Sequence, residues 1–119
     1  MSLTVYEYSR CGTCRKAIKW FNEKNIDVNL IPIVEEPPSA SEISELIQKS
    51  GLDIKKFFNT SGLVYKEMKL KDKLPTMSVE EKIKLLASNG KLLKRPIVTD
   101  GDKVTVGFKE ETFNEVWSK

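Results

Sequence analysis

The chain has 119 residues, of which 39% are hydrophobic and 31% charged, as is typical of one globular domain spanning residues 1–119. The net charge of +3 is too small and too dispersed to predict direct binding of nucleic acid. No apolar run approaches the roughly 18–20 residues of a membrane-spanning helix, and the N-terminal residues lack the basic flank and apolar block expected of a signal peptide. We therefore expect a cytoplasmic protein that does not bind membranes.

The first third of the chain predicts a strand, a helix and a second strand at residues 3–8, 12–25 and 28–33. Within the predicted helix, apolar residues recur at spacings of three and four, which is the pattern of one buried face. Strand, helix and strand in this short space suggest a right-handed crossover unit. Pro37 and Pro38 then interrupt regular structure.

The middle of the chain predicts a series of helices. Ser39 and Glu42 have the spacing of a capping box, and Gly51 is placed to end the helix that begins there. Residues 53–58 predict a short helix, and residues 59–62 a turn or the start of another. Residues 66–73 are rich in lysine, which favours a solvated helical face.

Ser78 and Glu81 repeat the capping-box spacing before a further helix that ends near residues 89–90. The pattern then changes. Two β-branched segments, 97–99 and 104–106, flank an Asp-Gly-Asp turn and predict a hairpin. A last helix, from about Lys109, places Phe113, Val116 and Trp117 on one side. The whole order predicts an α/β fold.

The chain has only two cysteines, and they form the sequence Cys11-Gly12-Thr13-Cys14 between the first predicted strand and helix. A Cys-x-x-Cys at a strand-to-helix junction is typical of a thiol–disulfide redox site. In a reducing compartment, such a pair is more often catalytic or sensing than structural.

Two other interpretations of the cysteines remain open. A zinc site would need further ligands, and the chain has no histidine and no third cysteine to supply them. The cysteines could also be inert buried thiols, although their position at a helix start favours exposure. We predict no metal and no cofactor.

The two cysteines are expected to have different roles. Unpaired backbone N–H groups and the positive end of the helix dipole favour a thiolate at Cys11, and Arg10 and Arg15 add positive charge on either side. Cys11, on the loop, is therefore the predicted nucleophile. Cys14, one turn into the helix on its apolar face, is the predicted resolving thiol.

Lys94-Arg95-Pro96-Ile97 is the second candidate segment. A trans proline here would only start the following strand. In redox folds of this type a cis-proline commonly faces the cysteines, but only about 5–6% of X–Pro bonds are cis. Arg95 could also be a surface partner of an acidic side chain.

Four segments together resemble the glutaredoxin-dependent arsenate reductase (ArsC) family, and the second cysteine makes the chain most similar to its Spx/MgsR-like branch. These segments are Tyr6–Arg15, Glu36–Ser39, Lys94–Ile97 and Val106–Phe108. The resemblance covers essentially the whole chain.

The resemblance implies a thioredoxin-like fold with a mixed four-stranded sheet, a helical insertion at about 39–90 and a cis peptide bond before Pro96. It also implies that Arg15 and Arg95, with Pro96, bind the anion or substrate. The family's arsenate reductases have two further arginines, where this chain offers Asn59 and the pair Phe108-Lys109.

Three functions follow from these expectations. The first is a monomeric thiol–disulfide oxidoreductase, in which Cys14 resolves an adduct of Cys11 and a thioredoxin- or glutaredoxin-type reductant restores the dithiol. The second is a redox-sensing regulator that, like Spx, binds the C-terminal domain of the RNA polymerase α subunit, with a docking surface around Gly51. The third is arsenate reduction with an atypical oxyanion site.

Overall fold

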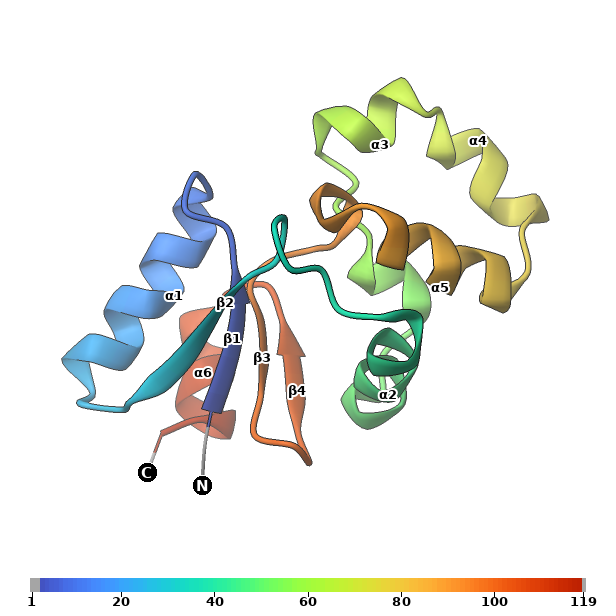
Figure 1. The fold of residues 1–119 in the computed structure, drawn as a ribbon. Coiled ribbons are helices and arrows are strands. Elements are labelled where there is room, and N and C mark those ends of the chain that lie inside the picture. The colour runs from blue at the N-terminus through green and yellow to red at the C-terminus, as the bar shows by residue number, and fades with distance from the viewer. Residues whose placement is uncertain (1–2, 119) are drawn as a thin grey trace.

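The computed structural model describes residues 3–118 and has a four-stranded sheet at its centre (Figure 1). The strands are β1 (Leu3–Glu7), β2 (Val28–Pro32), β3 (Ile97–Thr99) and β4 (Val104–Val106), in the order β2-β1-β3-β4. β1 pairs in parallel with β2 and antiparallel with β3, and β3 pairs antiparallel with β4. The sheet is therefore mixed, as the resemblance implies.

Two helices cover one face of this sheet. Helix α1 (Gly12–Glu23) connects β1 to β2, and α6 (Glu110–Val116) follows the β3–β4 hairpin. A strand–helix–strand unit followed by a hairpin and a helix is the thioredoxin-like arrangement, which confirms the predicted fold class. The core between helices and sheet consists of Val5, Ala17, Trp20, Phe21, Ile26, Val98, Phe113 and Trp117.

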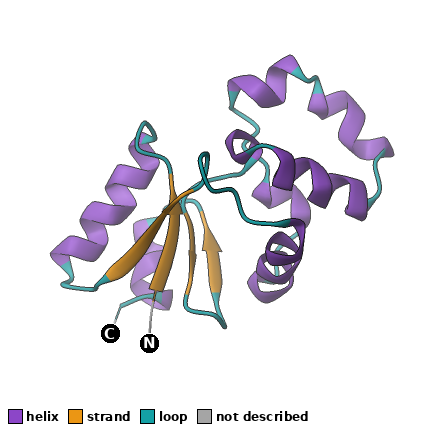
Figure 2. Ribbon diagram, viewed as in Figure 1, coloured by secondary structure: helices purple, strands orange, loops and turns teal. Residues whose placement is uncertain are grey.

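The remaining helices lie on the other side of the sheet and connect β2 to β3 (Figure 2). They are α2 (Ala40–Ser50), α3 (Leu63–Glu67), α4 (Leu70–Lys73) and α5 (Val79–Ser88), with 3-10 turns η1 (Ile54–Phe57), η2 (Leu74–Thr76) and η3 (Gly90–Leu92). No helix in residues 3–118 is long and apolar enough to cross a membrane.

Alternation along the central strands joins these two layers into one fold. Val5 and Val98 face α1 and α6, while their neighbours Tyr6 and Ile97 belong to the core under the helical segment. Successive side chains of a strand point to opposite faces, so one strand contributes to both cores.

Local signals in the sequence set several helix ends. Ser39 and Ser78 each cap a helix through a complete capping box, with Glu42 and Glu81 returning the second hydrogen bond. Gly51 ends α2 in the left-handed conformation, with a φ of 69°. These predicted caps are confirmed.

The lysine-rich segment is less regular than a single helix. Lys69 has a φ of 53°, and this left-handed residue separates α3 from α4. The lysines of the segment are exposed on both helices, so the predicted solvated face is confirmed.

Candidate redox site

The two cysteines lie where β1 gives way to α1. Cys11 is the N-cap residue of α1, and its backbone N–H donates a 2.9 Å hydrogen bond to the carbonyl oxygen of Tyr8. The Cys11 sulfur accepts a hydrogen bond from the backbone N–H of Cys14, at 3.4 Å. A cap of this kind fixes the sulfur against the positive end of the helix.

The cysteines differ in exposure, and both are free thiols. Cys14 has no exposed surface and packs on the apolar face of α1, as predicted. Cys11 is half-buried rather than freely exposed, because capping turns its side chain back over the first turn of the helix. Gly12 and Thr13 between them are exposed.

The pKa of Cys11 is lowered from its ordinary value of 9.0. Burial acts in the opposite direction, but hydrogen bonds from the thiol and backbone N–H of Cys14 and the neighbouring Arg95 guanidinium together outweigh it. The environment therefore favours a thiolate at this sulfur, in agreement with the predicted nucleophile.

The pKa of Cys14 is shifted in the opposite direction. Burial, followed by the hydrogen bond to Cys11 and the charge of Cys11, raises the pKa of Cys14 to about 12. Near neutral pH, Cys14 therefore keeps its proton and donates it toward the Cys11 sulfur. The two thiols are distinct, as a nucleophile and a resolving thiol would have to be.

Arg95 is the cation that acts on Cys11. The Arg95–Pro96 peptide bond is cis, as the resemblance implies. One guanidinium nitrogen donates to the carbonyl oxygens of Lys91 at 3.3 Å and Leu93 at 3.5 Å. Arg95 forms no ion pair with an acidic side chain among residues 3–118, so its interpretation as a surface salt-bridge partner is wrong.

Tyr8 completes the support of Arg95 and was not found from the sequence. The Arg95 guanidinium carbon lies 5.0 Å from the centroid of the Tyr8 ring, within the range of a cation–π contact. An aromatic residue three positions before a candidate nucleophile is a signal that could have identified it.

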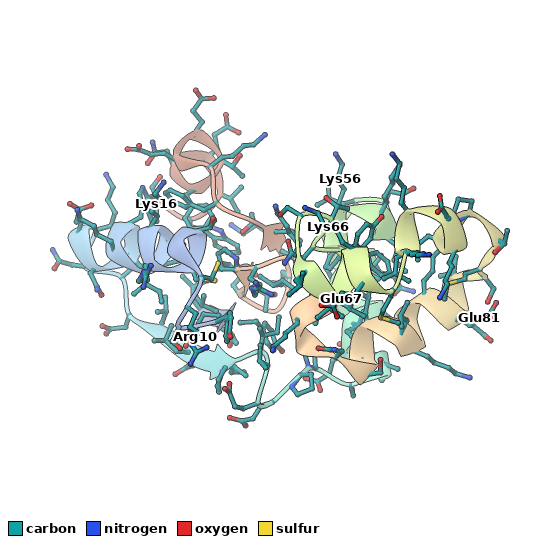
Figure 3. All side chains as sticks on the ribbon, turned by 90° about the horizontal axis from the view of Figure 1, so that it is seen from above. Arg10, Lys16, Lys56, Lys66, Glu67 and Glu81 are labelled. Atoms are coloured by element: carbon teal, nitrogen blue, oxygen red, sulfur yellow. The ribbon has the colours of Figure 1, made fainter. Side chains whose placement is uncertain are left out.

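The other two arginines lie farther out on the surface. Arg10 and Arg15 are exposed, and Figure 3 shows Arg10 beside the N-terminal end of α1. A Cβ built on Gly12 would lie 4.0 Å from a guanidinium nitrogen of Arg15, so Arg15 reaches over the Cys-x-x-Cys loop. The leading positive contribution at Cys11 comes from Arg95, not from these two residues as predicted.

The positions where the family's arsenate reductases carry further arginines have structural roles here. The Asn59 N–H donates to the carbonyl oxygen of Leu92 at 2.7 Å, within the turn before α3. Phe108 packs edge-on against Phe113, with ring centroids 4.7 Å apart, and Lys109 is exposed at the start of α6.

No group of three or more cysteine, histidine or carboxylate residues that could hold a metal occurs between residues 3 and 118.

Fold and site together define a thioredoxin-like protein with a Cys-x-x-Cys at the start of its first helix and a cis-proline beside it. The model of the ArsC family matches residues 6–116, and the chain belongs to this family. The predicted family is therefore confirmed.

Three similar proteins illustrate the range of the family. Uncharacterized protein YusI of Bacillus subtilis is 59% identical over 118 residues, covering 99% of this chain and all of YusI. Regulatory protein MgsR of the same species is 30% identical over 106 residues, covering 89% of this chain and 82% of MgsR. The crystal structure of an ArsC family related protein from Bacteroides fragilis is 51% identical, with a TM-score of 0.93 and 97% of each chain covered.

Proposed function

We propose that the protein is a thiol–disulfide oxidoreductase with Cys11 as nucleophile and Cys14 as resolving thiol. The observation that carries this proposal is the geometry of the two cysteines within one helical turn: the Cys11 sulfur caps α1 and accepts from the backbone N–H of Cys14, while Cys14 is buried. This geometry agrees with a pKa that is lowered at Cys11 and raised at Cys14. Exchange needs a thiolate attacker, and a protonated neighbour keeps the second thiol in reserve until the first has reacted.

The reaction uses two thiols and two electrons. The Cys11 thiolate attacks one sulfur of a substrate disulfide, which forms a mixed disulfide and releases the other sulfur as a thiolate. Cys14 then loses its proton and attacks the Cys11 sulfur, which releases the second substrate thiol and leaves a Cys11–Cys14 disulfide. A dithiol reductant of the thioredoxin or glutaredoxin type returns two electrons and restores the free thiols.

Three further residues are proposed to bind the substrate. Arg95 faces the Cys11 sulfur, Arg15 reaches over Gly12, and the buried Pro96 follows the cis peptide bond. Planar guanidinium groups hold carboxylates by paired hydrogen bonds, so these two arginines favour a substrate with an anionic group near its disulfide.

Two serine variants test this proposal directly. In the assay the protein reduces a model disulfide, and thioredoxin with its reductase regenerates the protein. Cys11→Ser abolishes this turnover, because the attacking thiolate is gone. Cys14→Ser still reacts once and accumulates a mixed disulfide at Cys11, visible as a mass increase that a reductant removes. Wild-type turnover in both variants would contradict the proposal.

A second candidate function is redox-sensing regulation, favoured by the similarity to Regulatory protein MgsR. The same disulfide would then change affinity for the C-terminal domain of the RNA polymerase α subunit rather than complete a catalytic cycle. Titration of that domain against reduced and oxidised protein tests it. Different affinities in the two states support regulation, and absence of binding in both rejects it.

Arsenate reduction is the third candidate, carried by the two arginines next to Cys11. It predicts oxidation of NADPH through a coupled glutaredoxin or thioredoxin system only when arsenate is present. NADPH consumption that does not depend on arsenate would reject this candidate.

A further inference from the structure

β4 is the outermost strand of the sheet, and a groove runs along its free edge. The groove has a volume of about 490 Å³ and lies between the C-terminal end of α2 with η1 on one side and α6 on the other. Its lining includes Leu52, Lys56, Lys94, Val104, Val106 and Lys109.

Hydrogen bonds at both ends of the hairpin show which backbone groups of β4 face this groove. The Gly107 N–H donates to the Pro96 carbonyl at 2.8 Å, and the Asp100 N–H donates to the Lys103 carbonyl at 3.4 Å. In an antiparallel ladder, hydrogen-bonded pairs of residues alternate with pairs that are not hydrogen-bonded. Bonds at these two places therefore make Thr105, opposite Val98, the residue of β4 that exchanges both of its hydrogen bonds with β3.

The N–H and C=O groups of Val104 and Val106 therefore point away from β3. Within residues 3–118, no other backbone or side-chain group forms a hydrogen bond with them beyond the β3–β4 ladder. Two donors and two acceptors, spaced as in an extended strand, are thus presented to the groove. An unpaired edge of this kind is a template for a further strand.

The positive charge of the groove favours an acidic strand over other possible occupants. Three lysines line it, Lys56 from η1, Lys94 before the cis peptide bond and Lys109 at the start of α6, and no acidic residue does. None of the three forms an ion pair among the described residues. A second copy of this chain would bring three more lysines to the same place, so like charges oppose pairing of two β4 edges.

The apolar part of the lining completes the site. Leu52, which is 41% exposed, contributes from the segment that follows α2, and Val116 contributes from α6. An added strand alternates its side chains between the two sides of the sheet. Each side of the groove offers a lysine and an apolar residue, Lys56 with Leu52 on the α2–η1 side and Lys109 with Val116 on the α6 side, so acidic and apolar side chains of the strand would both find partners there.

From the edge, the charge and the walls, we propose that the β4 groove binds an extended acidic segment of a partner protein as a fifth strand of the sheet. The backbone of the segment bonds to Val104 and Val106, and its carboxylates lie near Lys56, Lys94 and Lys109. Ser50 and Leu52 of the groove flank Gly51, so the groove overlaps the docking surface expected for the second candidate function, but the occupant proposed here is an extended strand. The redox chemistry at Cys11 does not enter this proposal.

The test uses the full-length protein and a capped five-residue peptide, Glu-Val-Glu-Val-Glu. Titration followed by amide shifts in ¹⁵N NMR is expected to be saturable, with the largest changes at Val104 and Val106. Binding should be at least about tenfold tighter than for Lys-Val-Lys-Val-Lys, because electrostatic complementarity selects between them. A titration with no saturable change at these two amides would overturn the proposal.

Two controls separate strand addition from simple attraction between charges. A peptide of the same charge, N-methylated at alternate residues so that it cannot pair, should bind at least about fivefold more weakly. The Val106→Pro variant removes one N–H that points away from β3 and leaves the hydrogen bonds to β3 in place. Its affinity for the unmethylated peptide should fall by a similar factor. Equal binding of the two peptides would overturn the proposal.

Charge reversal provides a test that does not depend on folding of the proline variant. Lys56→Glu/Lys94→Glu/Lys109→Glu should lose about tenfold or more in affinity for the acidic peptide and gain affinity for the lysine peptide. The matched control, Lys19→Glu/Lys73→Glu/Lys84→Glu, makes the same change in net charge at exposed residues outside the groove. Equal losses in both triple variants would overturn the proposal.

Discussion

At the scale of single residues, the site depends on Cys11, on the proton that Cys14 keeps and on the positive charge of Arg95. The Cys11 sulfur accepts from Cys14 and lies beside Arg95, while Arg95 is held by two backbone carbonyls and the ring of Tyr8. Each of these contacts lowers the free energy of the Cys11 thiolate or fixes the group that does so.

Replacing Arg95 should therefore raise the pKa of Cys11. Loss of an opposite charge next to a thiol raises its pKa, which makes the thiolate rarer at any pH below that pKa. The expected result for Arg95→Ala is a matching fall in the rate of iodoacetamide alkylation at pH 7, traced over a pH series. Arg15→Ala is the matched control and should change that rate by less than about twofold. Equal effects of the two variants would contradict the assignment.

Cys14 makes a prediction about stability at alkaline pH. Its pKa is 9.0 in an ordinary environment and about 12 in the folded protein, mainly because of burial. Between these values the unfolded chain releases the proton and the folded chain keeps it, so the contribution of the neutral thiol to stability is present below about pH 9 and is lost as pH rises.

Urea unfolding of Cys11→Ser and of Cys11→Ser/Cys14→Ala measures this effect without coupling between the two thiols. As the pH rises from about 8 to about 10.5, the unfolding free energy of Cys11→Ser, which keeps Cys14, should fall relative to that of the double variant. A difference that does not change with pH would show that Cys14 titrates normally in the folded protein.

At the scale of elements, the sequence predicted well wherever the signal is local. The two capping boxes, the glycine at the end of α2 and the Asp-Gly-Asp hairpin turn each depend on a few neighbouring residues. The break between α3 and α4 was not predicted, because Lys69 is not a residue type that signals a left-handed conformation.

Ser39 provides the test of a cap. Ser39→Ala removes the hydrogen bond from the Glu42 N–H to the serine oxygen, which measures 3.1 Å, and should cost about 1 kcal/mol of stability. Ser41→Ala, an exposed serine two residues further on, should change stability by less than about 0.5 kcal/mol. Denaturant unfolding of both variants measures the difference. Equal losses would show that the capping bond contributes nothing specific.

At the scale of the whole molecule, the helical segment rejoins the sheet through a close backbone contact. A Cβ at Gly90 would lie only 2.0 Å from the carbonyl oxygen of Ile33, just beyond the end of β2. Such contacts join residues far apart in the chain, so no local sequence pattern predicts them. The position of Arg95 on the Tyr8 ring is hidden from sequence reasoning for the same reason.

Gly90→Ala should accordingly be among the most damaging single changes outside the redox site. Overpacking against backbone costs about 1–3 kcal/mol, and the loss should appear as a lower thermal midpoint. Gly12→Ala is the control, because a Cβ there meets only the end of the Arg15 side chain at 4.0 Å. Equal midpoints for wild type and Gly90→Ala would show that the contact is looser than the structure indicates.

The central proposal, that Cys11 and Cys14 form a redox couple, is tested most directly by the midpoint potential of that couple. Alkylation after equilibration in dithiol buffers separates reduced from oxidised protein by mass. We expect a reversible two-electron transition between roughly −180 and −300 mV, the range of catalytic and sensing dithiols. Failure to form an internal disulfide at any potential would contradict the proposal and leave Cys11 as a single reactive thiol.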